Sequence, residues 1–223
     1  MHIHFVSLFP EIFDSFLSTS IIKKAQEKKL LEFSVINPRD FCADKHQQVD
    51  DTVYGGGDGM LIKAQPVIDA VESIVADIEG AWAIVMTSPG QDVFAQKHAH
   101  LFSKYDHLIF VCGRYEGIDY RFVQYMREKY DDKFFVLSLW AFVTLGWEAP
   151  AMVMTESIVR LVSGVIKEQG SWEEESYSVK KWWSNLEHPQ YTKPAEVHGY
   201  KVPDVLLSGD QGAIQKWKVE NSL

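Results

Sequence analysis

The sequence lacks several features that mark particular classes of protein. It has only two cysteines in 223 residues, Cys42 and Cys112, and neither belongs to a CxxC pair or to a cluster with histidine. This scarcity fits a reducing compartment and gives no sign of a disulfide framework or a zinc site, so we predict no metal ligands. The N-terminus has no basic stretch before a long apolar run, and no segment reaches the roughly 18 apolar residues of a membrane span. We therefore expect a cytoplasmic protein with no membrane partner.

An excess of positive charge is also absent. The formal net charge is −9, from 22 Lys and Arg against 31 Asp and Glu. Because phosphate binding depends on clustered cations, this balance argues against a general nucleic-acid coat, although it allows a local basic patch. With 46% hydrophobic residues, the chain can bury a sizeable core and suits one large domain or two small ones.

What is present is an alternation of apolar runs with helical patterns. The runs predict strands, and the spacing of apolar residues predicts helices between them. We expect strands over 2–8, 31–37, 81–87, 107–112, 134–139 and 142–145, and helices over 11–26, 65–77, 92–105, 121–130 and 151–162. Alternating strands and helices predict an α/β fold with a largely parallel sheet. Residues 38–60 have no apolar periodicity and are expected to form a long functional loop.

The run CGRYEGID, residues 112–119, directly follows the predicted strand 107–112. Its two glycines let the backbone turn tightly or approach a ligand, and ligands of open α/β sheets bind at the carboxyl ends of strands. The segments 87–91 and 138–150 also follow predicted strands, so the three could converge on one crevice suited to a flat nucleoside. The alternative is a surface turn with solvated charges.

Four glycines and three carboxylates crowd residues 50–60. Glycines in this number suggest backbone conformations or close approaches that other residues cannot adopt, while a mobile loop is the plainer alternative. The spacing matches neither a dinucleotide-binding nor a phosphate-binding glycine motif. Further along, Arg160 and the acidic run ending at Glu175 could face a substrate, or they could be solvated linker charges.

The tail combines lysines with tryptophans, a composition suited to an RNA backbone and stacked bases; the tryptophans could equally form the core of a small domain. These residues are Lys180, Lys181, Trp182, Trp183, Lys193, Lys201, Lys216, Trp217 and Lys218.

Seven motifs in order make the chain resemble the bacterial tRNA (guanine-N1)-methyltransferase family over nearly its whole length. They are SLFPEIFDSF, NPRDF, VDDTVYGGGDGM, CGRYEGID, EAPAM, YTKP and VPDVLLSG. The resemblance implies a SPOUT-type α/β fold, in which a trefoil-knotted parallel sheet carries a small C-terminal helical domain. It implies a cofactor-binding and dimerisation domain over 1–166, a linker over 167–176 and a tRNA-binding domain over 177–223. It also implies a homodimer with active sites at the interface.

The resemblance further implies methyl transfer from S-adenosylmethionine to N1 of the guanine 3′ of the anticodon in tRNA. By the family's pattern, the cofactor is held by Pro89, Gly113, Tyr115, Glu116, Leu139, Phe142, Gly146 and Pro150. The substrate-binding positions are Asp50, Tyr54, Gly55, Gly56, Gly59 and Met60, and the catalytic ones are Arg160 and Glu175. N1 carries a proton, so the transfer needs a base and a cation to stabilise charge on O6, roles that fit Glu175 and Arg160. The pattern leaves open whether Mg²⁺ assists.

Two departures from the family's pattern matter. Glu175 stands where the family has aspartate, and Trp140 and Trp147 replace glycines in the 138–148 loop. Two other functions therefore stay open: a non-catalytic RNA-binding or scaffold homologue that has lost the cofactor, and a SPOUT methyltransferase with another RNA target. The scaffold alternative predicts Trp140 and Trp147 inside the cofactor crevice, whereas an active methyltransferase predicts an open pocket between Pro89, Gly113 and Gly146.

Overall fold

The computed structural model describes residues 1–166, 176 and 187–222, with the side chains of residues 90 and 91 left out. The chain divides into two compact units, residues 1–167 and 168–223, each of which is described by itself.

The first unit is built on a five-stranded parallel sheet. Its strands are β1 (His2–Val6), β2 (Glu32–Ile36), β5 (Trp82–Val93), β6 (His107–Val111) and β7 (Phe134–Ser138). They lie in the order β2-β1-β6-β5-β7, and each neighbouring pair is parallel. The prediction of an α/β fold with a largely parallel sheet is confirmed.

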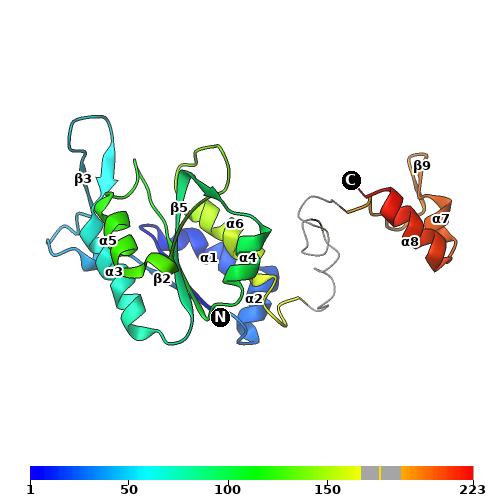
Figure 1. Ribbon diagram of the computed structural model, residues 1–223, viewed down its shortest axis with the longest axis horizontal. Helices are drawn as coiled ribbons and strands as arrows, with labels where there is room; N and C mark the ends of the chain where they lie inside the picture. The colour runs from blue at the N-terminus through cyan, green and yellow to red at the C-terminus, as the bar shows by residue number, and fades with distance from the viewer. Residues whose placement is uncertain (167–175, 177–186, 223) are drawn as a thin grey trace. The chain divides into compact units, whose positions relative to one another are not determined.

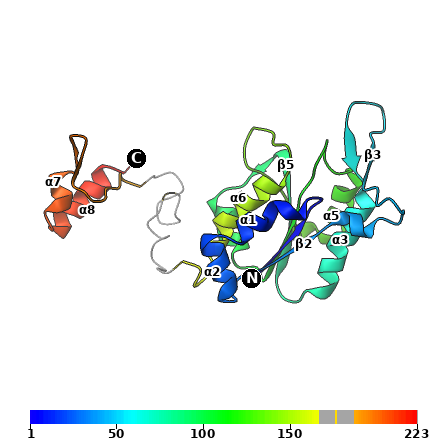
Figure 2. The same cartoon turned by 180° about the vertical axis from the view of Figure 1, so that it is seen from behind.

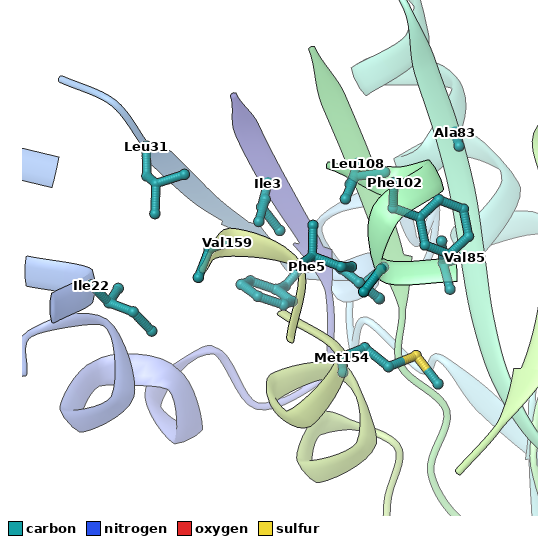
Figure 3. Packing of buried hydrophobic residues seen from close by; sticks show 14 of the residues in the cluster. Ile3, Phe5, Ile22, Leu31, Ala83, Val85, Phe102, Leu108, Met154 and Val159 are labelled. Atoms are coloured by element: carbon teal, nitrogen blue, oxygen red, sulfur yellow. The ribbon is translucent and has the colours of Figure 1, made fainter. Parts of the chain in front are cut away.

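Helices cover both faces of the sheet (Figures 1 and 2). Helices α3 (Ala64–Asp77) and α5 (Arg121–Tyr130) pack on one face, and α2 (Ser20–Glu27), α4 (Gln96–Phe102) and α6 (Glu148–Val159) pack on the other. Figure 3 shows the core between the sheet and helices α2, α4 and α6, where Phe5 of β1 lies among residues of these helices and of the neighbouring strands. Because both faces are covered, the central strands are apolar on both sides, which explains their continuous apolar runs.

Several predicted elements differ from the structure. The helix expected over 11–26 is three pieces: a 3-10 helix (Pro10–Phe13), α1 (Asp14–Leu17) and α2. Strand β5 continues to Val93 through a register shift between Thr87 and Asp92, so α4 begins at Gln96 and not at residue 92. Residues 142–145 form no strand, and the helix expected over 151–162 is α6, which runs from Glu148 to Val159. The expected loop 38–60 contains a 3-10 helix (Pro38–Phe41) and a hairpin of β3 (Asp50–Thr52) and β4 (Met60–Ile62).

The described part of the second unit has a hairpin of β8 (Glu196–Val197) and β9 (Tyr200–Lys201), followed by α7 (Asp204–Leu207) and α8 (Gln211–Glu220). Trp217 of α8 packs against His188 and Tyr191, with ring centroids 5.8 and 6.3 Å away. Trp217 therefore lies in a small cluster of partly exposed rings, whereas Lys180, Lys181, Trp182 and Trp183 lie outside the described residues. None of the helices in the described residues is long and apolar enough to cross a membrane.

Candidate active site

The carboxyl ends of β6, β5 and β7 lie at one edge of the sheet, because the three strands are parallel neighbours. Strand β6 leads into residues 112–119, β7 leads into residues 139–147, and β5 has its irregular stretch at the same edge. The β3–β4 hairpin projects from the end of the sheet opposite the N-terminus (Figure 1). The structure thus brings together the three predicted strand-end segments.

The 112–119 loop is held by backbone hydrogen bonds to two other segments. The amides of Glu116 and Asp119 donate to the carbonyls of Met60 and Ile62, at 3.0 and 2.9 Å. On the other side, the amide of Trp147 donates to the carbonyl of Gly113 at 3.1 Å. Tyr115 has a φ of 58°, a left-handed conformation that costs a non-glycine residue on the order of 1 kcal/mol and persists where the surroundings enforce it.

A cavity of about 30 Å³ opens between the β5 and β7 ends. Four of the predicted cofactor residues line it: Pro89, Leu139, Phe142 and Pro150. The rest of its wall is formed by Thr87, Ser88, Ser138, Trp140, Thr144 and Trp147. Tyr115 and Glu116 do not line it; both are exposed on the loop beside the hairpin.

Trp147 sits directly on Gly113. A Cβ atom at Gly113 would lie 2.6 Å from the indole ring, closer than real Cβ contacts, and the same ring faces Gly117 at ordinary contact distance. Position 113 therefore requires glycine because of Trp147. The indole also lines the cavity, as does Trp140, whose side chain is 64% exposed. Both tryptophans are thus at the crevice, and the pocket is narrow where an open one is expected of an active enzyme.

An ion pair with a buried carboxylate ties the 112–119 loop to the first residue of α6. The Arg114 Nε atom donates to Glu148 Oε1 at 3.0 Å and lies 2.9 Å from Oε2, while the Ser7 hydroxyl donates to Oε1 at 2.8 Å. Glu148 is 1% exposed, and the Arg114 guanidinium also lies 4.8 Å from the centre of the Phe9 ring. Gly146, one of the predicted cofactor residues, is buried and lies against this ion pair. A carboxylate this deep is stable only because it is paired and hydrogen-bonded.

The predicted substrate residues form the β3–β4 hairpin. Its base is fixed, because Met60 accepts the Glu116 amide and a Cβ at Gly59 would lie 2.6 Å from the Glu116 side chain. Its tip is open: Tyr54 is 96% exposed, and Gly55 and Gly56 have positive φ with no neighbouring atoms within 4 Å of an added Cβ. Asp50 begins β3 opposite Ile62. The hairpin thus presents an exposed aromatic ring beside the 112–119 loop.

Arg160, the one predicted catalytic residue that the structure describes, does not line the cavity. Arg160 caps the C-terminus of α6 and lines a separate surface pocket of about 320 Å³ with Ile21, Ile22, Glu156, Ser157, Val159 and Val165. Pro150, at the cavity, lies ten residues earlier on the same helix, so at 1.5 Å per residue the two are about 15 Å apart along the axis. Glu175 lies outside the described residues.

The chemistry of the cavity fits a nucleoside-type cofactor, but its volume requires movement. Its wall combines aromatic and proline side chains with polar groups, and the buried Thr87 Oγ1 atom has no hydrogen-bond partner among the described residues. A buried orphan hydroxyl calls for a partner, which a ligand could supply. However, about 30 Å³ holds roughly one water molecule. A nucleoside enters only if the 139–147 loop, with Trp147, moves outward.

Sequence patterns did not point to several of these residues. Ser7, Thr87 and Thr144 are isolated polar residues in apolar surroundings, and their roles depend on neighbours far away in the chain. Glu148 was the one with a usable signal, because a lone carboxylate begins the apolar helix EAPAMVM and must find a partner when that helix is buried.

Comparisons with known proteins agree over the full length. A family model described as "tRNA (Guanine-1)-methyltransferase TrmD" matches residues 1–223. The chain is 44% identical to the tRNA (guanine-N(1)-)-methyltransferase of Bacillus velezensis, covering 100% of this chain and 88% of that protein. It is 46% identical to the protein of the same name from Metamycoplasma arthritidis, covering 100% of this chain and 90% of that one. The corresponding protein of Dictyoglomus turgidum is 43% identical, over 100% and 85%.

Proposed function

This chain belongs to the tRNA (guanine-1)-methyltransferase family, and on that premise we propose how its residues bind the cofactor and move the methyl group. It is a tRNA (guanine-N1)-methyltransferase, and the observation that carries this conclusion is the match over all 223 residues. A methyltransferase of this family uses S-adenosylmethionine, which supplies the methyl group on a positively charged sulfur.

The cofactor is proposed to lie at the strand-end cavity. Pro89, Leu139, Phe142 and Pro150 would form its walls, and the orphan hydroxyl of Thr87 would accept or donate a hydrogen bond. Gly113 and Gly146 would offer backbone once Trp147 moves outward, while Tyr115 and Glu116 would close the side nearest the hairpin. The convergence of the three loops supports this placement.

The transfer needs a base and a cation. The cofactor would give its methyl carbon to N1 of guanine, and the electron pair of the broken carbon–sulfur bond would stay on sulfur. The N1 proton would pass to a carboxylate. We assign the carboxylate to Glu175 and the stabilisation of charge developing on O6 to Arg160. The resemblance of these positions to the family's pattern supports the assignment, since the guanidinium and the carboxylate are both retained.

The spacing along α6 supports an active site made by two copies of the chain. Arg160 and the cavity are about 15 Å apart along one helix, so the Arg160 of the same chain does not line the cavity. A second copy of the chain could place its own Arg160 beside this cavity. Exposed apolar side chains on the cavity loop, such as Leu145 at 95%, also favour burial against a partner. The homodimer is therefore part of the proposal, and the trefoil knot of the SPOUT fold is proposed from the family resemblance alone.

The exposed hairpin tip and the tail are proposed to bind tRNA. Tyr54 offers a flat ring for stacking on a base, and Lys193, Lys201 and Lys216 offer cations for phosphates. The target guanine is proposed to be the one 3′ of the anticodon. A cytoplasmic location and a helper role for Mg²⁺ stay predictions.

Transfer of labelled methyl groups to unmodified tRNA tests the function. Wild type should label tRNA and produce a primer-extension stop at the guanine 3′ of the anticodon, because N1 methylation blocks base pairing. Arg160→Ala and Glu175→Gln should each lower kcat about a hundredfold or more. Arg127→Ala, which removes an exposed arginine on α5, is the matched control and should keep wild-type activity.

One observation favours the scaffold alternative, namely that Trp140 and Trp147 both line the crevice. The same assay separates the functions. Labelled tRNA with a stop elsewhere would indicate another RNA target, whereas tRNA binding with no labelling and no calorimetric binding of S-adenosylmethionine at millimolar concentration would indicate a scaffold.

A further inference from the structure

Three histidines meet at the amino ends of the strands, the opposite end from the cavity. His2 and His4 are two residues apart on β1 and so share a face, and His107 begins β6 in register with His2. The rings of His2 and His4 stack with centroids 3.9 Å apart. One ring nitrogen from each histidine lies within 4.8 Å of the other two.

The spacing of these nitrogens matches a metal-binding geometry. Zinc binds histidine nitrogen at about 2.0–2.1 Å in a tetrahedral arrangement, which places two ligating nitrogens roughly 3.3 Å apart. His4 Nε2 and His107 Nδ1 are 3.2 Å apart. The ring nitrogen that His2 offers lies within 4.8 Å of both.

An orphan nitrogen provides a second, independent observation. The Nε2 atom of His2 is buried and has no hydrogen-bond partner among the described residues. A buried polar atom without a partner costs about 1–3 kcal/mol and calls for an explanation. A bound metal would use this nitrogen's lone pair.

Side chains outside the cluster contact the outer nitrogens of His4 and His2. The Ser34 hydroxyl lies 2.7 Å from His4 Nδ1, which leaves His4 Nε2 to face the cluster, and Glu32 Oε2 lies 3.8 Å from His2 Nδ1, which leaves His2 Nε2 to do likewise. Such outer contacts commonly fix the orientation of metal-binding histidines.

We propose that His2, His4 and His107 bind one divalent transition-metal ion, with Zn²⁺ as the reference ion. Three imidazoles favour Zn²⁺, Co²⁺ or Ni²⁺ over Mg²⁺, which prefers oxygen ligands. Water takes the fourth position, because His2 and His107 are half-exposed. The ion links β1 to β6 at their amino ends. Its site is distinct from that of any Mg²⁺ ion that serves methyl transfer. The proposal does not depend on the methyltransferase function.

Calorimetric titration of the full chain with ZnCl₂ tests the site. The protein must carry no polyhistidine tag, because such a tag binds zinc itself. Wild type should bind one equivalent, and Co²⁺ should give the visible absorption of a tetrahedral, nitrogen-rich site. His107→Gln and His2→Gln, both at half-exposed positions, should each weaken zinc binding at least about tenfold.

The matched control is His46→Gln, which removes an exposed histidine outside the cluster and should bind zinc as wild type does. Circular dichroism and tRNA labelling check that each variant is folded. Zinc should also raise the Tm of wild type and of His46→Gln, but not of His107→Gln. The proposal is overturned if wild type binds no zinc, or if His107→Gln and His46→Gln bind it equally. In either case the cluster is a stack of imidazoles in which His4 and His107 share a hydrogen bond, and the methyltransferase function is unaffected.

Discussion

The two loops that border the cavity differ in how they are held. Residues 112–119 are fixed by backbone hydrogen bonds to β4 on one side and to Trp147 on the other. Within the described part of the chain, the hydrogen bonds of residues 140–146 stay inside the segment 138–146, and Trp140, Phe142, Val143 and Leu145 are exposed. One loop is preorganised and the other has little to hold it, so the second determines whether the pocket is open or closed.

This difference shows where the family's pattern can change without loss of the fold. The 112–119 loop matches the family in every residue quoted for it, and it is the loop with the most backbone partners. The two tryptophans occur in the loop with few partners. A bulky residue there alters the ligand-free volume, whereas even a Cβ at Gly113 would lie 2.6 Å from the Trp147 ring.

The largest expected effect comes from breaking the ion pair that joins the 112–119 loop to α6. Glu148→Ala leaves the Arg114 guanidinium, 21% exposed, without its carboxylate, so we expect the free energy of unfolding to fall by about 3 kcal/mol. Glu148→Gln can still accept from Arg114 and Ser7 and should cost less. Urea unfolding followed by circular dichroism measures both. A loss below about 1 kcal/mol for the alanine variant would mean that the pair behaves as a surface salt bridge.

The next effect probes the contact between Gly113 and Trp147. Gly113→Ala places a methyl group against the indole ring, so we expect a loss of about 2 kcal/mol from overpacking. In a protein that already carries Trp147→Gly, the Gly113→Ala change should cost much less stability, because the indole ring is absent. The double-mutant cycle therefore predicts strong coupling. Additive losses would show that Trp147 does not rest on Gly113.

A smaller effect is expected at the hairpin base. Gly59→Ala forces a side chain into a φ of +92° and against Glu116, which should cost about 1–2 kcal/mol and raise the KM for tRNA. Gly55→Ala, at a φ of +90° with open surroundings, is the matched control because it has the strain without the contact. If the two variants lose the same stability and have the same KM for tRNA, then the contact between position 59 and Glu116 does not contribute.

The smallest perturbation uses the two native thiols as reporters. Burial raises the pKa of Cys112 well above its ordinary value, and Cys42, which is less buried, also has a raised pKa. A thiol reagent should modify Cys42 first and Cys112 at least about tenfold more slowly, when the anchored loop opens. Cys42→Ser should leave only the slow phase. Equal rates would contradict the view that the 112–119 loop is held closed.

Local patterns predicted much of the fold. The apolar runs of β1, β6 and β7 and the spacing in α3 and α5 gave elements close to the observed bounds. They did not predict the β3–β4 hairpin, whose strands have only three residues each and whose β4 is bonded to the 112–119 loop. Nor did they predict the continuation of β5 beyond Pro89, which depends on pairing with β7 after a register shift.

The candidate site was predicted in part. The three strand-end segments were expected to converge, and Pro89, Leu139, Phe142 and Pro150 do line one cavity. The partners Gly113 with Trp147 and Arg114 with Glu148 are more than 30 residues apart, so no local pattern could pair them. The histidine cluster was missed for the same reason, because the sheet alone brings His107 to β1.

The central claim is that the anchored 112–119 loop and the displaceable 139–147 loop form an S-adenosylmethionine site that Trp147 narrows. Calorimetry of S-adenosylmethionine with wild type, Trp147→Gly and Trp140→Gly tests it most directly. Wild type should bind, Trp147→Gly should bind about tenfold more tightly because no ring has to be displaced, and Trp140→Gly should change little because that ring is largely exposed. Equal affinity of wild type and Trp147→Gly, or no binding by any of the three, would contradict the claim.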